Sequence, residues 1–266
     1  MITSFSNNSV KSIRKLSARK ERQASGLFFI EGLHIVAEAI DCDATIETLV
    51  ISAELLQSEF GKSQVSRCKQ KGIPLLEVSA EIFRSLSHKD GPQGIGAVVH
   101  QNWRALNTIH LQAGQIWTAL DSIQNPGNLG SILRTSDSVG ATGVILLDQS
   151  TDPYAPQAVK ASMGALFSQT KVKTGFQGFS DWLKAENARV IGSSDKADMD
   201  YMDTHYPDPC ILLMGSEREG LAQDYLDLCD QVVKIPMQGR SDSLNLAIAT
   251  SIILYQIYNQ KRKSVV

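Results

Sequence analysis

The stretch IWTALDSIQNPGNLGSILRTSDSVGATGVILL, residues 116–147, decides the fold of this chain. Ile116–Leu120 and Gly143–Leu147 are apolar runs of strand length. Between them, Asn128 can cap a helix with its side-chain oxygen, and Gly140 is a favourable stop at the helix end. A strand, a helix and a second strand in this order form a βαβ unit, which builds parallel sheets. The stretch therefore predicts an α/β fold.

The loop before this helix has an unusual composition. Asn125, Gly127, Asn128 and Gly130 crowd the helix start, where unpaired N–H groups and the helix dipole favour a negatively charged group. The same residues also suit a loop that needs glycine for its turn and asparagine for its cap, and both interpretations stay open. Arg134 falls on the helix face opposite the apolar stripe, where a solvated arginine is the simpler interpretation.

The composition is that of a globular protein with two domains. The 266 residues exceed the usual length of one domain, and a hydrophobic content of 42% is enough for normal cores. The net charge of −2 gives no overall nucleic-acid signature. The charge is uneven, because residues 1–105 hold 13 Lys and Arg against 11 Asp and Glu, whereas residues 106–266 hold 13 against 17.

A basic segment near the N-terminus accounts for this unevenness. Residues 9–25 are expected to form a helical segment in which Ile13 and Leu16 face a core. Its cations are Lys11, Arg14, Lys15, Arg19, Lys20 and Arg22, and only Glu21 opposes them. Such a run is either a solvated helix face or a surface that contacts phosphates.

Several protein classes are excluded. The four cysteines, Cys42, Cys68, Cys210 and Cys229, form no C-x-x-C pair, so we expect neither a metal site nor thioredoxin-like chemistry. The first residues lack the apolar core of a signal peptide, and no apolar run reaches transmembrane length. We therefore expect a cytoplasmic protein with reduced thiols and no membrane contact.

Strands and helices are predicted to alternate along the chain, which indicates α/β domains. Residues 1–102 are expected to form a small α/β domain, the polar residues 103–114 a linker, and residues 115–266 the parallel-sheet domain. Three local expectations are a helix at Ala53–Lys71, a helix at Ala155–Phe167 and an irregular segment at Ala197–Pro209.

Three loops are predicted to follow strands at one end of the parallel sheet. They are Ser122–Asn128, Gly215–Leu221 and Pro236–Ser243. Ligands of open α/β sheets bind beyond the carboxyl ends of the strands, so these loops are the candidate site. None of them carries the G-x-G-x-x-G dinucleotide fingerprint or a Walker A loop, which disfavours a nucleotide-dependent oxidoreductase.

The three loops resemble the three motifs of the SpoU, or TrmH-like, branch of the SPOUT methyltransferases. The motifs are NPGNLGSILRTSDSVG, LLMGSEREGL and IPMQGRSDSLNLAIA, and KASMGALF at residues 160–167 is similar to the intermediate helix of the family. The resemblance is strong over roughly residues 115–260. It is weaker over residues 10–100, which resemble the ribosomal-protein-like RNA-binding domain found in the family.

The resemblance implies an α/β domain with a deep trefoil knot, a homodimer, and S-adenosylmethionine as cofactor. The implied reaction is methylation of a ribose 2′-hydroxyl in RNA. We expect 23S ribosomal RNA as the first candidate substrate and transfer RNA as the second. The rival interpretation is a catalytically silent RNA-binding protein of the same fold, which the complete set of motif residues argues against.

The resemblance also assigns residues to the site. The catalytic positions are Asn128, Arg134, Glu217, Ser243 and Asn245, and the cofactor positions are Met214, Gly215, Ser216, Gly220, Ile235, Pro236, Met237, Ser243 and Leu244. The basic segment would bind RNA. The family's proposed base is Arg134, but arginine stays protonated in proteins, so we expect it to hold a phosphate and stabilise the developing alkoxide. Glu217 is expected to orient other groups. Ser216 and Arg218 depart from the smaller residues common in the family.

Overall fold

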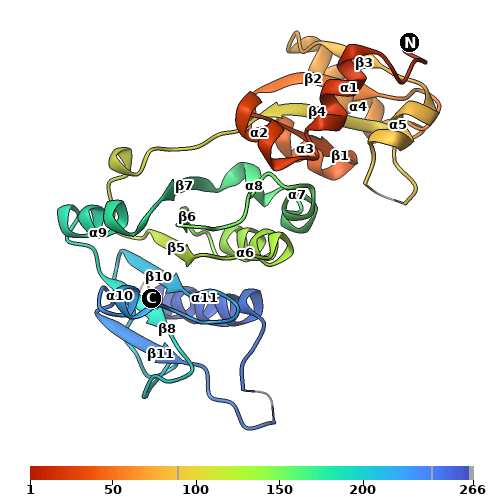
Figure 1. Cartoon of the computed structure of the whole chain (residues 1–266). Helices are drawn as coiled ribbons and strands as arrows, with labels where there is room; N and C mark the ends of the chain where they lie inside the picture. Colours follow the sequence, from red (N-terminus) through yellow and green to blue (C-terminus); the bar gives the residue numbers. More distant parts are fainter. Residues whose placement is uncertain (89, 241, 264–266) are drawn as a thin grey trace. The chain divides into compact units, whose positions relative to one another are not determined.

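The computed structural model describes residues 1–88, 90–240 and 242–263 (Figure 1). The chain forms two compact units. The first contains residues 1–101 and 152–168, and the second contains residues 102–151 together with the chain from residue 169 onward. Residues 152–168 thus pack with the N-terminal part of the chain, although the sequence placed them in the domain of residues 115–266.

The first unit has a four-stranded sheet in the order β1-β4-β2-β3, in which only β2 and β3 are parallel. Its strands are β1 (Leu27–Glu31), β2 (Ile46–Ile51), β3 (Leu75–Glu77) and β4 (Ile95–His100). Its helices are α1 (Asn8–Lys15), α2 (Arg19–Ser25), α3 (Leu33–Asp41), α4 (Glu59–Gln70), α5 (Ala80–Leu86), α7 (Pro156–Ser162) and α8 (Ala165–Ser168). Val10, Ile13 and Leu16 pack with Ile82 and Phe83 in one core cluster.

Three helices of this unit differ from their predicted bounds. The basic segment forms two helices, α1 and α2, separated at Leu16–Ala18. Helix α4 begins at Glu59 because the Ser58 hydroxyl accepts a hydrogen bond from the amide of Gly61, which caps the helix there. The helix expected at Ala155–Phe167 is divided into α7 and α8, since Met163 and Gly164 adopt φ values of 52° and 99°.

The second unit has a seven-stranded sheet in the order β7-β6-β5-β10-β8-β11-β9, in which every pair is parallel. The strands are β5 (Ile116–Asp121), β6 (Gly143–Leu147), β7 (Thr170–Thr174), β8 (Val190–Ser193), β9 (Met199–Asp200), β10 (Cys210–Met214) and β11 (Gln231–Lys234). The helices are η1 (Leu106–Thr108), α6 (Pro126–Ser138), α9 (Phe176–Ala185), α10 (Gln223–Leu226) and α11 (Leu246–Lys263). The expected parallel α/β sheet is confirmed, and the segment expected to be irregular contains the short strand β9.

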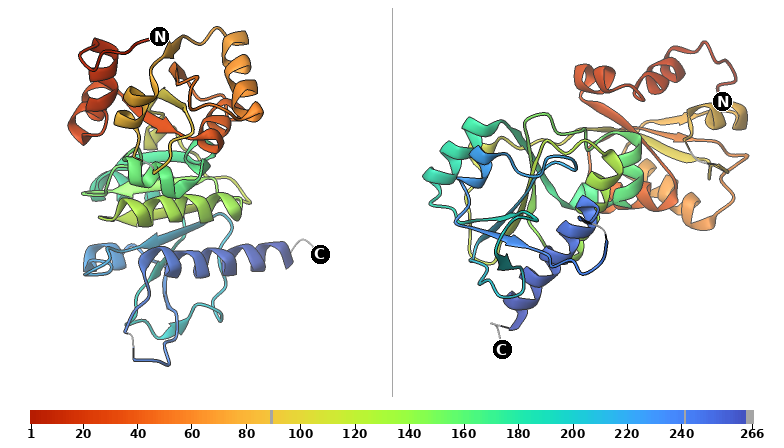
Figure 2. Two further views of the ribbon diagram at one scale, coloured as in Figure 1. Left: turned by 90° about the vertical axis from the view of Figure 1, so that its right-hand side faces the viewer. Right: turned by 60° about the horizontal axis from the view of Figure 1, so that its bottom comes forward.

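Helices α6 and α11 lie side by side (Figures 1 and 2), and the hydroxyls of Thr135 and Ser251 share a 2.8 Å hydrogen bond between them. A core cluster that includes Trp117, Phe179 and Ile211 joins strands β5 and β10 to helix α9. All five residues of β10 are buried. This buried framework fixes where each strand ends, and so positions the loops that follow.

Candidate active site

The three predicted loops do follow strands that run in the same direction. Strands β5, β10 and β11 belong to one parallel sheet, and β5 pairs directly with β10. The carboxyl ends of parallel strands meet at the same edge of a sheet. The prediction that the loops share this edge is therefore confirmed.

One residue from each of the three motifs joins a continuous hydrogen-bond network. The Glu217 carboxylate accepts from the Asn128 side-chain amide at 3.0 Å, and Asn245 Nδ2 donates to Asn128 Oδ1 at 3.0 Å. The amide of Ala247 in turn donates to Asn245 Oδ1 at 3.0 Å. Because every link has a defined donor and acceptor, the network fixes the orientation of both asparagine amides.

Glu217 also holds the backbone of the first loop. Its Oε2 accepts from the amide of Gln124 at 3.1 Å, and its Oε1 accepts from the amide of Asn125 at 3.2 Å. Burial by itself would raise the pKa of Glu217, but these amides and Asn128 favour the ionised form and together lower it below its usual value. The carboxylate therefore stays charged at neutral pH and acts as an acceptor.

The cap of α6 differs from the sequence expectation. Asn125, not Asn128, is the N-cap, and its Oδ1 accepts from the amides of Gly127 at 2.8 Å and Asn128 at 3.3 Å. Pro126 explains the difference, because proline favours the first position of a helix. The residue directly before Pro126, which is Asn125, is therefore the cap. The Asn128 side chain is consequently available for the network.

Arg134 and Ser243 lie outside the network. Both are exposed, and within the described part of the chain neither side chain has a hydrogen-bond or ion-pair partner. Arg134 lies on α6, six residues after Asn128, and Ser243 lies two residues before Asn245. Their functional groups therefore remain free to contact a ligand.

The cofactor positions form two contrasting loops. A Cβ at Gly215 would lie 2.0 Å from the carbonyl carbon of Gly220. Only glycine therefore allows these two backbone segments to approach so closely. Ser216 and Gly220 then exchange two backbone hydrogen bonds of 3.1 Å each, which makes this turn rigid. Met214, before the turn, is fully buried as the last residue of β10.

The other cofactor loop offers unused polar groups beside apolar side chains. In the described residues 235–240, no backbone N–H donates a hydrogen bond to a described residue. Ile235 and Leu244 are half-buried, Pro236 is exposed, and Met237 is 37% exposed. Ligand sites for nucleosides combine such apolar surface with a few backbone donors and acceptors, so these residues fit the adenosyl and methionine parts of S-adenosylmethionine.

A model of the SpoU rRNA methylase family matches residues 115–255, which include all three loops. The chain belongs to this family. The SpoU methylase also matches a model of the MRM3-like substrate binding domain over residues 7–97. The predictions of family and enzyme class are thereby confirmed.

Individual relatives agree with this assignment. The methylase is 28% identical to the 23S rRNA (guanosine(2553)-2′-O)-methyltransferase RlmP of Bacillus subtilis, over 96% of this chain and 98% of the relative. It is 30% identical to the 23S rRNA (uridine(2479)-2′-O)-methyltransferase of Streptomyces viridochromogenes, over 92% and 87%. The crystal structure of an AdoMet-bound rRNA methyltransferase from Sinorhizobium meliloti aligns with a TM-score of 0.90 and 34% identity, covering 97% of each chain. This alignment and the parallel sheet confirm the predicted SPOUT-type fold class.

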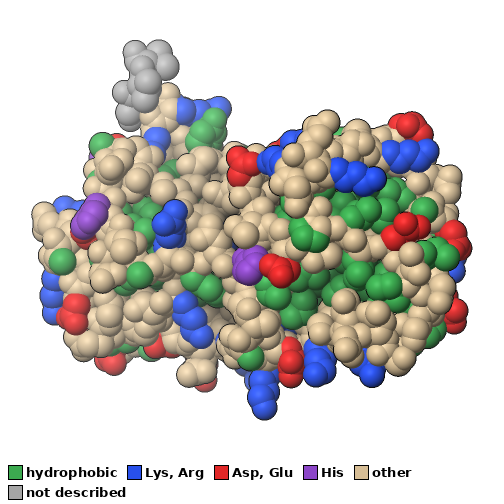
Figure 3. Space-filling model, turned by 90° about the horizontal axis from the view of Figure 1, so that it is seen from above, with side chains coloured by type: hydrophobic (Ala, Val, Ile, Leu, Met, Phe, Trp, Pro, Cys, Tyr) green, Lys and Arg blue, Asp and Glu red, His purple; other side chains and the backbone are tan. Residues whose placement is uncertain are grey.

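Five of the six predicted RNA-binding cations are exposed on the helical segment of the SpoU methylase. They are Lys11, Arg14, Lys15, Arg19 and Lys20. On the face drawn in Figure 3, Lys and Arg side chains are interspersed with acidic ones, so any attraction to RNA on that face is local.

The prediction for Arg22 is wrong. Its side chain is 3% exposed, and its guanidinium pairs with the Asp152 carboxylate at 2.7 Å. Nη1 also donates to the carbonyls of Leu16 and Ser17 at 2.8 Å each. These contacts satisfy the charge inside the first unit, so Arg22 is not available to a phosphate.

An acidic pair, Asp121 and Asp148, lies at the same sheet edge and was not predicted from the sequence. Asp121 ends β5 and is buried, which raises the pKa of its carboxyl, and the nearby Asp148 and Glu219 raise it further against a hydrogen bond from Ser122. Asp148 follows β6 and accepts a 2.5 Å hydrogen bond from the Tyr225 hydroxyl. The available signal was an aspartate directly after each of two buried strands.

Among the described residues, no group of three His, Cys, Asp or Glu could hold a metal ion, and no helix has the length and apolarity of a membrane span.

Proposed function

We propose that this SpoU methylase transfers a methyl group from S-adenosylmethionine to a ribose 2′-hydroxyl of 23S ribosomal RNA. The observation that carries the proposal is the network joining Asn128, Glu217 and Asn245, one residue from each motif. The two relatives, both named as 23S rRNA 2′-O-methyltransferases, support the substrate class. We further propose that the reaction takes place in the cytoplasm.

When bound, S-adenosylmethionine supplies a methyl group on a sulfonium, which is already activated for transfer. The turn at Gly215–Gly220 and the loop from Ile235 to Leu244 would hold it, through backbone donors and apolar side chains. The chain itself must orient the 2′-hydroxyl and stabilise the charge that develops on its oxygen, while the hydroxyl proton passes to solvent water.

Arg134 performs the electrostatic part of this task. Its exposed guanidinium holds an RNA phosphate and stabilises the developing alkoxide, since arginine stays charged and cannot accept the proton. Glu217 is a positioning residue, because its carboxylate holds Asn128 and the backbone at Gln124 and Asn125. Asn128, Asn245 and Ser243 present polar groups to the ribose.

The second unit is proposed to act as a homodimer. Helix α11 exposes three large apolar side chains, with Ile248 at 53%, Tyr255 at 46% and Tyr258 at 37%. The neighbouring α6 carries the exposed Arg134. Pairing of two copies through these helices would bury the apolar face, and light scattering at micromolar concentration should report a dimer. A monomer would contradict this part of the proposal.

The first unit is proposed to hold RNA through its exposed cations. Neutralising Lys15, Arg19 and Lys20 together should weaken RNA binding without changing the methylated nucleotide, because phosphate contacts position the RNA and do not read its sequence. The slope of log K against log salt should become shallower by about 2 to 3 for three lost contacts. Equal affinities and equal slopes would assign the segment to a solvated helix face.

The substrate is tested with the purified protein, labelled S-adenosylmethionine and either 23S ribosomal RNA or total transfer RNA. The proposal expects methyl incorporation into the ribosomal RNA. Incorporation into transfer RNA alone would replace the substrate, and incorporation into neither, with RNA binding intact, would favour the catalytically silent RNA-binding protein. Arg134→Ala should abolish most incorporation while calorimetry shows that cofactor affinity survives.

A further inference from the structure

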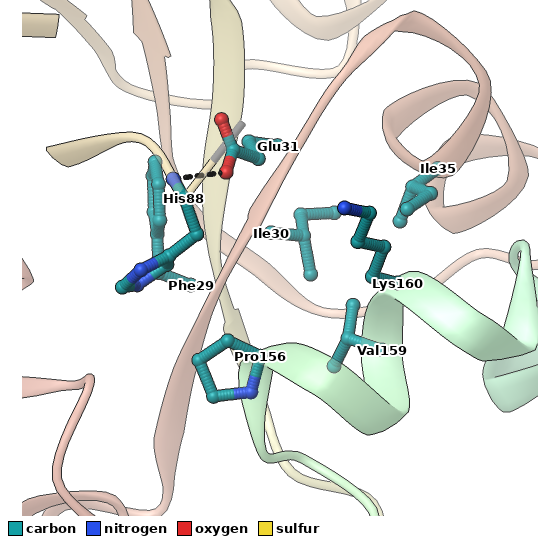
Figure 4. A pocket seen from close by; sticks show the side chains of 8 residues that line it. All are labelled: Phe29, Ile30, Glu31, Ile35, His88, Pro156, Val159 and Lys160. Atoms are coloured by element: carbon teal, nitrogen blue, oxygen red, sulfur yellow. Dashed lines mark hydrogen bonds between the residues drawn. The ribbon is translucent and has the colours of Figure 1, made fainter. Parts of the chain in front are cut away.

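The first unit carries an open groove that none of the three active-site loops lines. One part is a pocket beside β1 (Figure 4), lined mainly by Phe29, Glu31, His88, Pro156, Val159 and Lys160. An adjoining hollow shares Phe29, His88 and Pro156 and adds Arg14, Ser17 and Ser85. Because the two hollows share three residues, they form one continuous surface, here named the Phe29 groove.

The walls of the Phe29 groove are held in place by packing and hydrogen bonds. A Cβ at Gly96 would lie 2.7 Å from Cζ of Phe29, so the aromatic ring rests directly against the backbone of β4. The Glu31 carboxylate accepts from the amide of His88 at 2.6 Å and from the hydroxyl of Ser87 at 2.5 Å. These contacts fasten the segment that carries His88 to the end of β1.

The other wall comes from the segment of residues 152–168. The Tyr154 ring packs on Phe28 of β1 with a centroid distance of 4.7 Å, and Asp152 pairs with Arg22. Figure 4 shows the Lys160 side chain reaching from α7 towards β1, and the His88 imidazole beside the Phe29 ring. The groove is thus assembled from four separate parts of the chain, namely residues 14–17, 29–31, 85–88 and 156–160.

The free charges of the groove are positive. Arg14 lies at one end, where it donates to the Ser85 hydroxyl at 3.2 Å, and Lys160 lies at the other. Neither the Lys160 ammonium nor the His88 ring has a hydrogen-bond partner within the described ranges. The carboxylate of Glu31 already accepts two hydrogen bonds from its own chain. The groove therefore offers aromatic surface between cations.

We propose that the Phe29 groove binds an unpaired nucleotide of the RNA substrate. The base stacks on the Phe29 ring beside His88, and the flanking phosphates contact Lys160 and Arg14. Aromatic stacking between cations is how proteins hold single-stranded RNA, whereas paired bases expose no face for stacking. This inference rests on the proposed function, since it presumes an RNA substrate, and it assigns to the first unit a preference for unpaired RNA.

The test is fluorescence anisotropy with a single-stranded oligouridine of about 12 nucleotides and an RNA duplex of equal length, across a salt series. The wild-type chain should bind the single strand more tightly. Phe29→Leu should weaken single-strand binding about tenfold with an unchanged salt slope, because it removes stacking but no charge, and Phe29→Tyr should retain affinity. Lys160→Gln should weaken binding and make the slope shallower by about 0.7.

Lys69→Gln is the matched control, because Lys69 is exposed on α4 of the same unit and lines neither hollow. Lys160→Gln and His88→Ala alter exposed side chains, so they carry the test if Phe29→Leu disturbs folding. The proposal would be overturned if Phe29→Leu, Lys160→Gln and His88→Ala all bound the single strand as tightly as Lys69→Gln does. It would also be overturned if these variants lost equal affinity for the single strand and for the duplex.

This outcome is separable from that of the proposed function. Groove-dependent binding of oligouridine without methyl transfer to ribosomal RNA would refute the methylation and support the groove. Methyl transfer with oligouridine binding that ignores Phe29, His88 and Lys160 would refute the groove alone.

Discussion

The buried ion pair between Arg22 and Asp152 gives a sharp test of the first unit. The two side chains are 3% and 9% exposed, and the guanidinium also donates to two backbone carbonyls. Arg22→Met removes the positive charge and leaves the carboxylate buried with its remaining contact, a 2.9 Å hydrogen bond from the amide of Tyr154. Breaking a buried pair in this way costs about 3–5 kcal/mol of the free energy of unfolding.

The assay is urea unfolding of the full chain. With a denaturant slope of about 2 kcal/mol per molar, a loss of about 4 kcal/mol lowers the midpoint of the first unit by about 2 M. Arg22→Met combined with Asp152→Asn should recover part of the loss, since no unpaired charge then remains buried. Lys20→Met, at an exposed position of the same helix, should stay within about 0.5 kcal/mol of wild type.

RNA binding in native buffer separates the two interpretations of Arg22. Lys20→Met should make the salt slope of binding shallower by about 0.9, whereas Arg22→Met should leave it unchanged. An Arg22→Met variant as stable as Lys20→Met, with a shallower salt slope, would refute the buried pair and restore Arg22 as a phosphate contact.

The remaining predictions concern the active site. Gly215→Ala should abolish S-adenosylmethionine binding in calorimetry, because its Cβ would meet the Gly220 backbone, and an unchanged affinity would contradict this close approach. Asn125→Ala should cost about 1 kcal/mol in urea unfolding through loss of the α6 cap, and an unchanged midpoint would contradict the capping geometry. The pKa of Glu217 is lowered from its ordinary value of 4.5, so its ionised form stabilises the fold at pH values above 4.5. This contribution, about 1 kcal/mol or less after solvent screening, is lost as the pH falls through the lower pKa of the folded state. Glu217→Gln should therefore flatten the acid limb of the stability profile, and an unaltered limb would contradict the network.

The sequence was sufficient to predict the active-site edge of the second unit. Ile116–Leu120 and Ile211–Met214 are short apolar runs followed by loops rich in Asn and Gly, and such runs have few alternatives to buried parallel strands. Once the strands are parallel, geometry alone brings their following loops to one edge. Local chemistry was harder, since Asn125 and Asn128 can both cap a helix and only the position of Pro126 decides between them.

The contacts of the first unit could not be predicted in the same way. Arg22 stands among five exposed cations, and its partner Asp152 is 130 residues away, so no local pattern marks it as buried. The rings of Tyr154 and Phe167 pack on Phe28, so residues 152–168 belong to the first unit. This holds although the strands before and after this segment, β6 and β7, belong to the parallel sheet of the second unit. Such long-range packing overrides the order of elements along the chain.

The central claim is that the three loops methylate a ribose 2′-hydroxyl, and the chemical position of the transferred methyl group tests it most directly. Ribosomal RNA treated with the methylase and isotopically labelled S-adenosylmethionine is digested to nucleosides and analysed by mass spectrometry, with Arg134→Ala as the control. We predict that the label appears in one 2′-O-methylnucleoside and is nearly absent with Arg134→Ala. Label on a base, or equal labelling by the wild-type and Arg134→Ala proteins, would contradict the account.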